Sequence, residues 1–136
     1  MDEKQEKLKE KYMEMQMLDQ QIKQAQKQIQ MIEQQVNELN NVKQNLDNIK
    51  SVDEDTEVLS SISSGIFVKA KIGKADKLLV NVGADVMVEK DIDSTKELID
   101  QQIKEMHNVQ MQTDGEMQKL AQRASSLQNE LAKLVE

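Results

Sequence analysis

The chain contains no cysteine, no proline and no tryptophan, and its 136 residues include one tyrosine and one phenylalanine. Without cysteine there is no disulfide, no thiolate metal site and no cysteine nucleophile. Aromatic side chains carry much of the buried area of ordinary cores, so an aromatic content of 1% argues against a conventional globular core. Disordered chains are also poor in aromatics, but they lack the periodic apolar residues that this chain has. The composition therefore favours long helices and makes an enzyme the weaker hypothesis.

The charge pattern lacks any basic cluster, and the formal net charge is −7. Phosphate contacts need a concentrated Lys/Arg surface, so we expect no nucleic-acid partner. No uninterrupted apolar run approaches the roughly 20 residues that span a bilayer, so we expect no membrane partner either. Residues 1–12 are charged throughout and lack the apolar stretch of a signal peptide. We therefore expect a cytoplasmic protein.

Residues 1–50 are predicted to form one long helix. Their apolar residues are spaced alternately three and four apart, which is the a/d seam of a left-handed coiled coil. Lys11 and Lys43 interrupt this seam, and Val42 and Ile49 suggest a shifted register after Leu39, so we expect the supercoil to relax near the helix end. The seam residues are Leu8, Met15, Leu18, Ile22, Ala25, Ile29, Ile32, Val36, Leu39 and Leu46.

Residues 93–136 repeat this arrangement in one heptad frame. Gln110 and Thr113 are its polar positions and Gly115 follows them, so we expect a flexible or splayed stretch there. A helix start is marked between Asp91 and Ser94, and the run 94–97 has the form of a capping box. The apolar seam residues are Ile103, Met106, Met117, Leu120, Ala124, Leu127, Leu131 and Leu134.

Residues 51–92 form a connector in which the apolar period changes from helical to two, which is typical of strands. Turn residues at 63–65, 73–76 and 83–85 separate four short strands, the first of them around Val58, Leu59 and Ile62. Two hairpins are not stable alone in water, so we expect them to pair with other subunits. The predicted fold is α+β: helix, two β-hairpins, helix, with the helices folded back as a long antiparallel coiled coil. The predicted assembly residues are Ile66, Val68, Ile72, Leu78, Val80, Val82, Val86 and Val88.

The residues that usually carry chemistry are sparse. His107 is the only histidine and has too few partners for a metal site. Acidic residues 53–55 lack the glycine and the spacing of a calcium loop, and Gly73-Lys74 lacks the glycine-rich stretch of a phosphate loop. The serines at 60–64 have no His–acid pair beside them. We predict no catalytic residue, no cofactor and no metal.

Several apolar residues near the two ends of the chain are not needed by the seam. If the helices fold back, both ends meet at one tip, where these residues and their seam neighbours form an apolar patch. Methionine is unbranched and polarizable, which suits surfaces that must fit many partners. The alternative is that these side chains pack on a third helix or lie on frayed ends. The candidate tip residues are Leu8, Tyr12, Met13, Met17, Leu131, Leu134 and Val135.

The strand segment carries a family resemblance. The stretches SGIFVKA at 64–70 and LLVNVGADVMVEK at 78–90 resemble the α-class prefoldin subunit, and the archaeal α subunits most of all. Four strands favour the α class, because β-class subunits carry one hairpin. The family usually has a Val-Pro-Ile/Val-Gly-like stretch before its second strand, whereas this chain has LSSISSG at 59–65.

The resemblance implies a hexamer of two α and four β prefoldin subunits. Its hairpins would join into β-barrels that form the body, and its coiled coils would extend as tentacles. Such a complex binds non-native client proteins at the tentacle tips without ATP and transfers them to a group II chaperonin. The competing hypothesis from the residues is a structural or scaffolding coiled coil that binds no client.

Overall fold

The computed structural model describes residues 2–74 and 76–135 and divides into two compact units. The terminal unit contains residues 1–36 and 105–136, and the central unit contains residues 37–104. The elements follow the order α1 (Glu3–Lys50), β1 (Glu57–Ser63), β2 (Ile66–Lys71), β3 (Leu78–Asn81), β4 (Met87–Lys90) and α2 (Ile92–Val135). The predicted order of helix, two hairpins and helix is confirmed. In the part of the chain that the structure describes, neither helix is long and apolar enough to cross a membrane.

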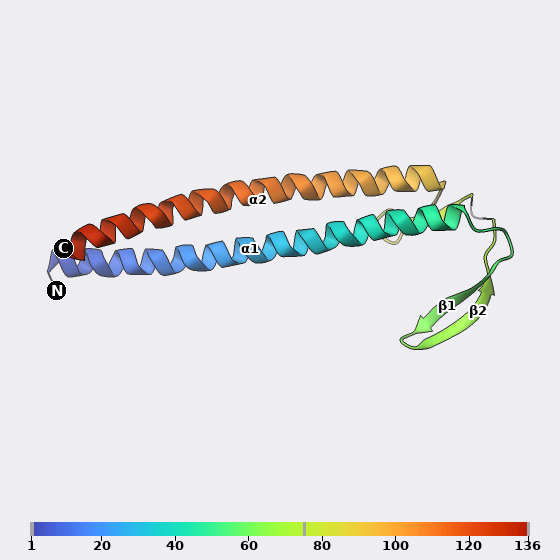
Figure 1. The fold of residues 1–136 in the computed structure, drawn as a ribbon, viewed down its shortest axis with the longest axis horizontal. Helices are drawn as coiled ribbons and strands as arrows, with labels where there is room; N and C mark the ends of the chain where they lie inside the picture. Colours follow the sequence, from blue (N-terminus) through green and yellow to red (C-terminus); the bar gives the residue numbers. More distant parts are fainter. Residues whose placement is uncertain (1, 75, 136) are drawn as a thin grey trace. The chain divides into compact units, whose positions relative to one another are not determined.

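The terminal unit is an antiparallel pair of helical segments, with both ends of the chain at the same end of the unit (Figure 1). Leu18, Ile32 and Val36 of α1 are buried along the predicted seam. Leu127 of α2 is fully buried, with an exposed fraction of 0%, and Leu131 is buried one turn later. The period of the apolar residues therefore identified the contact face of both helices correctly, because every turn of an amphipathic helix presents the same stripe.

The seam of α2 is closed at the position where we expected it to splay. Thr113 is buried, with an exposed fraction of 4%, and its hydroxyl donates to the Val109 carbonyl oxygen at 2.9 Å. Helix α2 continues through Gly115 without a break. The expectation of a splayed stretch is wrong at Thr113, because a threonine that satisfies its hydroxyl within its own helix can occupy an apolar seam.

In the central unit, the seam of α1 keeps its frame to Leu46, which is buried. The predicted shift of register is wrong at Val42, since that side chain is exposed. Lys43 occupies the seam position instead, and its Nζ lies 2.5 Å from Asp100 Oδ1 on α2. A lysine can bury its aliphatic stem in a seam while its ammonium group reaches a carboxylate at the rim.

Helix α2 begins one residue after Asp91, which is its N-cap. The Ser94 backbone N–H donates to Asp91 Oδ1 at 2.7 Å, and the Thr95 hydroxyl donates to the Asp91 carbonyl oxygen at 2.7 Å. The prediction of a capping box starting at Ser94 is wrong, because Ser94 already lies inside the helix. Asp91, three residues earlier, accepts the N–H of Ser94 instead, and its negative charge suits the positive end of the helix dipole.

The β1–β2 hairpin is antiparallel and pairs Val58 with Ala70 and Ser60 with Val68. A bulge between Ser61 and Ser63 precedes the turn, in which Gly65 has a φ of 79°. This positive φ is easy for glycine alone. The serine-rich segment that departs from the family pattern therefore still forms a strand and a tight turn.

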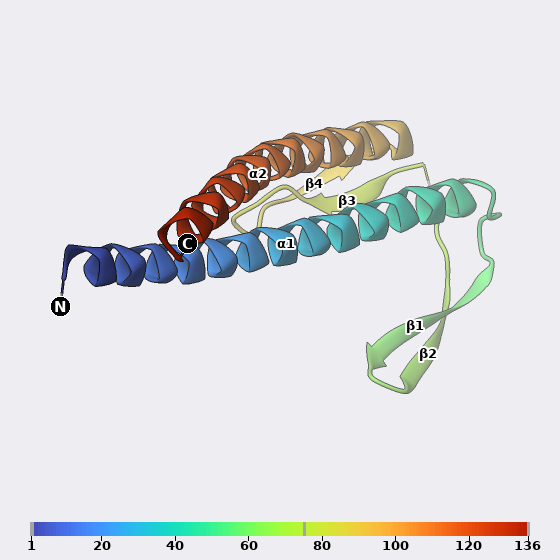
Figure 2. The same cartoon turned by 60° about the vertical axis from the view of Figure 1, so that its left-hand side comes forward.

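The β3–β4 hairpin packs on the helices of the central unit (Figure 2). It pairs Val80 with Val88, and the Val86 N–H donates to the Gly83 carbonyl oxygen at 3.0 Å to close the turn. Leu78 packs against a cluster formed by Leu46, Ile92 and Ile99. This contact anchors the second hairpin through β3.

Candidate functional site

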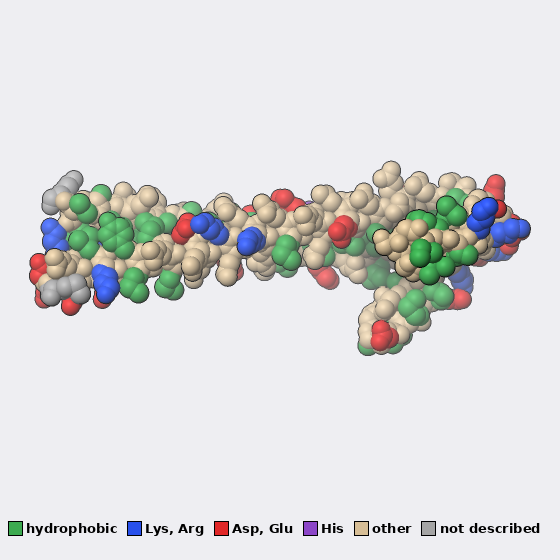
Figure 3. Space-filling model, turned by 90° about the horizontal axis from the view of Figure 1, so that it is seen from below, with side chains coloured by type: hydrophobic (Ala, Val, Ile, Leu, Met, Phe, Trp, Pro, Cys, Tyr) green, Lys and Arg blue, Asp and Glu red, His purple; other side chains and the backbone are tan. Residues whose placement is uncertain are grey.

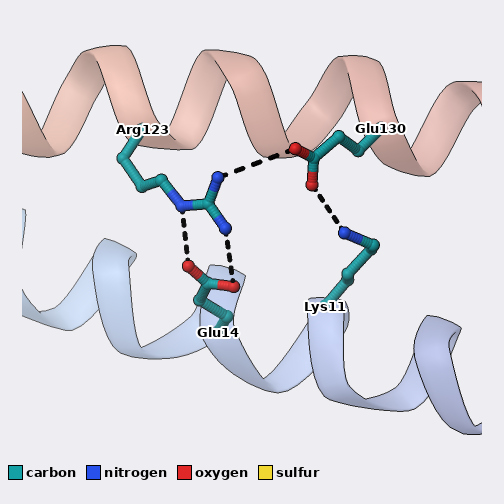
Figure 4. Close-up of polar contacts among 4 residues, drawn as sticks. All are labelled: Lys11, Glu14, Arg123 and Glu130. Carbon is teal, nitrogen blue, oxygen red and sulfur yellow. Dashed lines mark hydrogen bonds and ion pairs between the residues drawn. The ribbon is translucent and has the colours of Figure 1, made fainter.

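Four charged side chains join the two helices near the ends of the chain (Figure 4). Lys11 Nζ lies 2.6 Å from Glu130 Oε2. The Arg123 guanidinium is bidentate on Glu14, with Nε–Oε1 and Nη2–Oε2 distances of 2.8 and 3.1 Å. Arg123 Nη1 also lies 3.7 Å from Glu130 Oε1. We call this network the tip clamp, because it links α1 and α2 at the end of the terminal unit that carries both chain ends.

The tip clamp lowers the pKa values of its two carboxyl groups. The hydrogen bond from Arg123 holds the pKa of Glu14 below its usual value, and the Lys11 hydrogen bond does the same to the pKa of Glu130. Both carboxylates are partly exposed to solvent, so water and salt screen their attraction to Arg123 and Lys11. The clamp therefore selects the alignment of the helix ends more than it adds stability.

The structure separates the predicted tip residues into two classes. Leu131 is buried between the helices, while Leu8 and Leu134 are half-buried at neighbouring seam positions. The exposed class is Tyr12, Met13, Met17 and Val135. We call these four side chains the exposed tip residues. Of the predicted tip residues, these four are the ones with more than half of their surface exposed.

Met13 and Met17 are adjacent on the surface of α1, because residues four apart lie on the same helix face. Their exposed fractions are 57% and 61%, and neither residue is a seam position. In the space-filling view, hydrophobic side chains gather at the end of the terminal unit that carries the chain ends (Figure 3). The end of this unit therefore combines an apolar surface with a charged clamp that holds it together.

The predicted assembly residues also fall into two groups. Leu78 and Val80 alternate with exposed neighbours on β3 and are half-buried, and Leu78 takes part in the helix cluster. Ile72 is half-buried as well. The residues left exposed are Ile66, Val68, Val82, Val86 and Val88.

Sequence reasoning missed the apolar residues on the opposite faces of the strands. Leu59 and Ile62 of β1, Phe67 of β2, Leu79 of β3 and Met87 of β4 are all exposed. The signal was present, since strands with apolar residues at consecutive positions are typical of sheets covered on both faces. Both hairpins therefore display apolar surface that the single chain does not cover.

The residues considered above for metal binding or catalysis lie outside the tip. His107 is exposed, and its Nδ1 lies 3.4 Å from Gln110 Oε1. Within residues 2–74 and 76–135, no group of three or more His, Cys, Asp or Glu side chains could hold a metal ion. The acidic connector does contain a tight turn, in which Asp55 has a φ of 65°. Its N–H donates to the Ile72 carbonyl oxygen at 2.8 Å, so it extends the β1–β2 ladder.

Comparison with protein families finds one matching model, described as prefoldin subunit, over residues 18–136. Among curated proteins, the chain is similar to prefoldin subunit alpha of Archaeoglobus fulgidus, with 25% identity over 92% of this chain and 91% of the relative. It is also similar to prefoldin subunit alpha 1 of Methanocaldococcus jannaschii, with 29% identity over 93% of this chain and 86% of the relative.

Comparison with solved structures finds the same fold. A chain of filamentous PFD from Methanocaldococcus jannaschii, determined by cryo-EM, superposes with a TM-score of 0.81. The match covers 88% of this chain and 98% of the other, at 21% sequence identity. At this identity, the match supports the pair of long helices with two small hairpins.

Proposed function

The chain belongs to the prefoldin family as an α-class subunit, and we propose that it holds unfolded client proteins at the exposed tip residues without ATP. Prefoldins are chaperones rather than enzymes. As a prefoldin subunit, the chain is expected to act as part of a chaperone, and the exposed tip residues are the surface that we assign to client binding.

The observation that carries the proposal is the exposure of Tyr12, Met13, Met17 and Val135 at the end of the terminal unit. An unfolded client exposes apolar segments of varied shape, and contact with these side chains removes apolar area from water on both sides. Methionine side chains adapt to irregular partners because they are flexible and polarizable. The surface therefore suits binding that is apolar and unselective.

The assembly that would bring several tips together is part of the proposal. The apolar side chains left exposed on both hairpins need partners, and edge strands readily pair with strands of another chain. We propose that β1–β2 and β3–β4 join the hairpins of β-class prefoldin subunits in a β-barrel body, with two α and four β subunits. Linked tips then gain roughly 10²–10⁴ in avidity over one weak tip.

The remaining parts of the proposal concern where the client goes. Transfer to a group II chaperonin, and a cytoplasmic site of action, follow from the family premise. The transfer and the location can each be tested by a separate experiment. Chaperonin transfer predicts that a client held by the complex is folded only after the chaperonin and ATP are added, and cell fractionation reports the location.

The test uses the full chain assembled with a β-class prefoldin, with the mass of the complex measured in solution. A denatured client is then diluted into the complex without ATP, and its aggregation is followed by light scattering. Changing Tyr12, Met13 and Met17 together to serine should leave the complex assembled but raise the concentration needed for half-suppression by about tenfold, because the avidity of the linked tips falls.

The matched control changes Met31 and Met111 to serine. These methionines are exposed by 61% and 71%, so the control removes two exposed methionines from the terminal unit outside the tip, as the tip variant removes Met13 and Met17. The control should suppress aggregation like the unchanged protein. Equal suppression by the tip variant would overturn the proposal. A chain that forms a stable two-chain rod and ignores both the β subunit and the client would be a scaffold.

A further inference from the structure

All the sulfur of this chain is in methionine. The sequence contains nine methionines and no cysteine. A thiolate would otherwise be the first side chain to react with peroxide, and its absence leaves the thioether as the oxidisable group. Oxidation of this chain by peroxide is therefore directed by the accessibility of its methionines.

The structure sorts the methionines by accessibility. Met15, Met106 and Met117 occupy seam positions and are half-buried. Met13 and Met17 lie off the seam with exposed fractions of 57% and 61%. They make up two of the four exposed tip residues, and they sit on the same helix face. Among the residues that the structure describes, the other exposed methionines are Met31, Met87 and Met111.

We propose that Met13 and Met17 form a reversible oxidation site, at which hydrogen peroxide switches off the apolar surface of the tip. The inference rests on the proposed function, since it assigns a means of control to the same surface. Its chemical part, the reaction of these two sulfur atoms, can be measured without any client.

The reaction balances with peroxide as the only oxidant. The thioether sulfur attacks one oxygen of hydrogen peroxide, the O–O bond breaks, an S–O bond forms, and the second oxygen leaves as water with both protons. Sulfur is oxidised by two electrons and the peroxide is reduced. A thiol-dependent methionine sulfoxide reductase reverses the change by removing the oxygen as water.

The consequence is local because the two sulfur atoms lie outside the helix seam. A sulfoxide is polar and accepts hydrogen bonds from water, so it resists transfer to an apolar client surface. Leu18 and Leu127, which hold the helices together near the tip, are buried and keep their contacts. The tip would therefore lose its apolar character while the coiled coil stays folded.

The test compares two variants of the full chain. The first changes Met31, Met87 and Met111 to leucine, so the tip pair is the only exposed pair of described methionines left. The second changes Met13, Met17 and Met87 to leucine and leaves Met31 and Met111. Each chain is treated with hydrogen peroxide, the peroxide is destroyed with catalase, and the chain is assembled with an untreated β-class subunit. Removal of peroxide keeps the client itself from being oxidised.

Three readouts follow each treatment. Peptide mass spectrometry locates each added oxygen, binding of a hydrophobic dye reports the apolar surface, and aggregation of a denatured client reports the chaperone activity. We expect the first variant to gain oxygen at Met13 and Met17, to lose dye binding and to need about tenfold more complex for half-suppression, a change equivalent to about 1.4 kcal/mol. Reductase treatment should restore it. The second variant should suppress aggregation equally well before and after peroxide treatment.

The outcomes separate the two proposals. If the untreated chain suppresses aggregation, but oxygen at Met13 and Met17 leaves suppression and dye binding unchanged, the oxidation switch is wrong and the tip function stands. If the untreated chain suppresses nothing, the proposed function is wrong, and the switch with it. Slow oxidation of Met13 and Met17 relative to Met15 would overturn the assignment of the site.

Discussion

Lys11 Nζ and Glu130 Oε2 lie 2.6 Å apart, although the two residues are separated by 119 positions in the sequence. Lys11 is a seam position of α1, where an apolar residue would pack more tightly. A lysine at such a position specifies the register of a coiled coil at a cost in stability. The second seam lysine, Lys43, is paired in the same way with Asp100 in the central unit. Each unit thus has a charged pair that aligns its two helical segments.

Acid should weaken the terminal unit through the tip clamp. The pKa values of Glu14 and Glu130 are lowered from 4.5 in the folded chain, because Arg123 and Lys11 bind their charged forms. A lowered pKa contributes stability that is complete above the unfolded value and is lost as the pH falls through the folded one. The melting temperature, followed by circular dichroism, should therefore decrease once the pH is lowered below about 4.5.

The control for this prediction changes Glu14 and Glu130 to glutamine. The variant should melt below the unchanged chain at pH 7, and its melting temperature should depend less on pH in the acid range. Salt should reduce the difference in melting temperature, because both pairs remain accessible to solvent and are screened by ions. A melting temperature of the unchanged chain that stays constant from neutral to acid pH would contradict this role of the clamp.

Leu127→Ala should be the most costly of the simple truncations in the seam. Leu127 has an exposed fraction of 0%, so truncation leaves a cavity between the helices and costs about 3 kcal/mol. Urea unfolding of the full chain measures the loss. Met111→Ala, at an exposed position of the same helix, should stay within about 0.5 kcal/mol of the unchanged chain. Similar losses in the two variants would mean that Leu127 is not the centre of the contact.

Asp91→Ala should lower the melting temperature more than Ser94→Ala. The Asp91 carboxylate accepts the Ser94 backbone N–H at 2.7 Å, whereas Ser94 lies within the first turn of α2. This hydrogen bond also holds the pKa of Asp91 below its usual value. Thermal unfolding of the two variants side by side measures the difference. The reverse order would favour the capping box that the sequence pattern suggested.

Phe67→Lys should prevent assembly while leaving the helices intact. Phe67 is exposed on β2 in the single chain, and a charge there would be buried at a subunit contact without a partner. Mass measurement in solution with a β-class subunit reports the assembly, and circular dichroism reports the helix content. Lys71→Gln, on the same strand, is the control and should still assemble. Full assembly of the Phe67 variant would place the subunit contact elsewhere.

The periodic elements were predictable because period is a local property. Every apolar seam residue named for α1, from Leu8 to Leu46, is buried or half-buried, and the seam of α2 is confirmed in the same way. The strands around the turns at Gly65 and Gly83 are confirmed as well, since those glycines have φ values of 79° and 117°. Such positions favour a residue without a side chain, and a glycine can be read directly from the sequence.

Polar residues at seam positions were less predictable, because their burial depends on the hydrogen-bond or ion-pair partners that the folded helices supply. Val42 and Lys43 are consecutive, and hydrophobicity alone favours Val42 for the seam. Asp100 on α2 gives the Lys43 ammonium group a partner, and the frame continues to Leu46. Thr113 likewise looked like a weak point, yet its hydroxyl bonds within its own helix and the side chain is buried.

The sequence by itself determined the order of helix, two hairpins and helix, and the stripe by which each helix makes contact, because both follow from the spacing of apolar residues along one chain. Only the tertiary structure decided which tip residues remain accessible. Leu131 and Met13 are both apolar and both lie near an end of the chain, but Leu131 is buried and Met13 is exposed. Burial depends on the second helix, which approaches α1 from one side and leaves Met13 and Met17 on the surface.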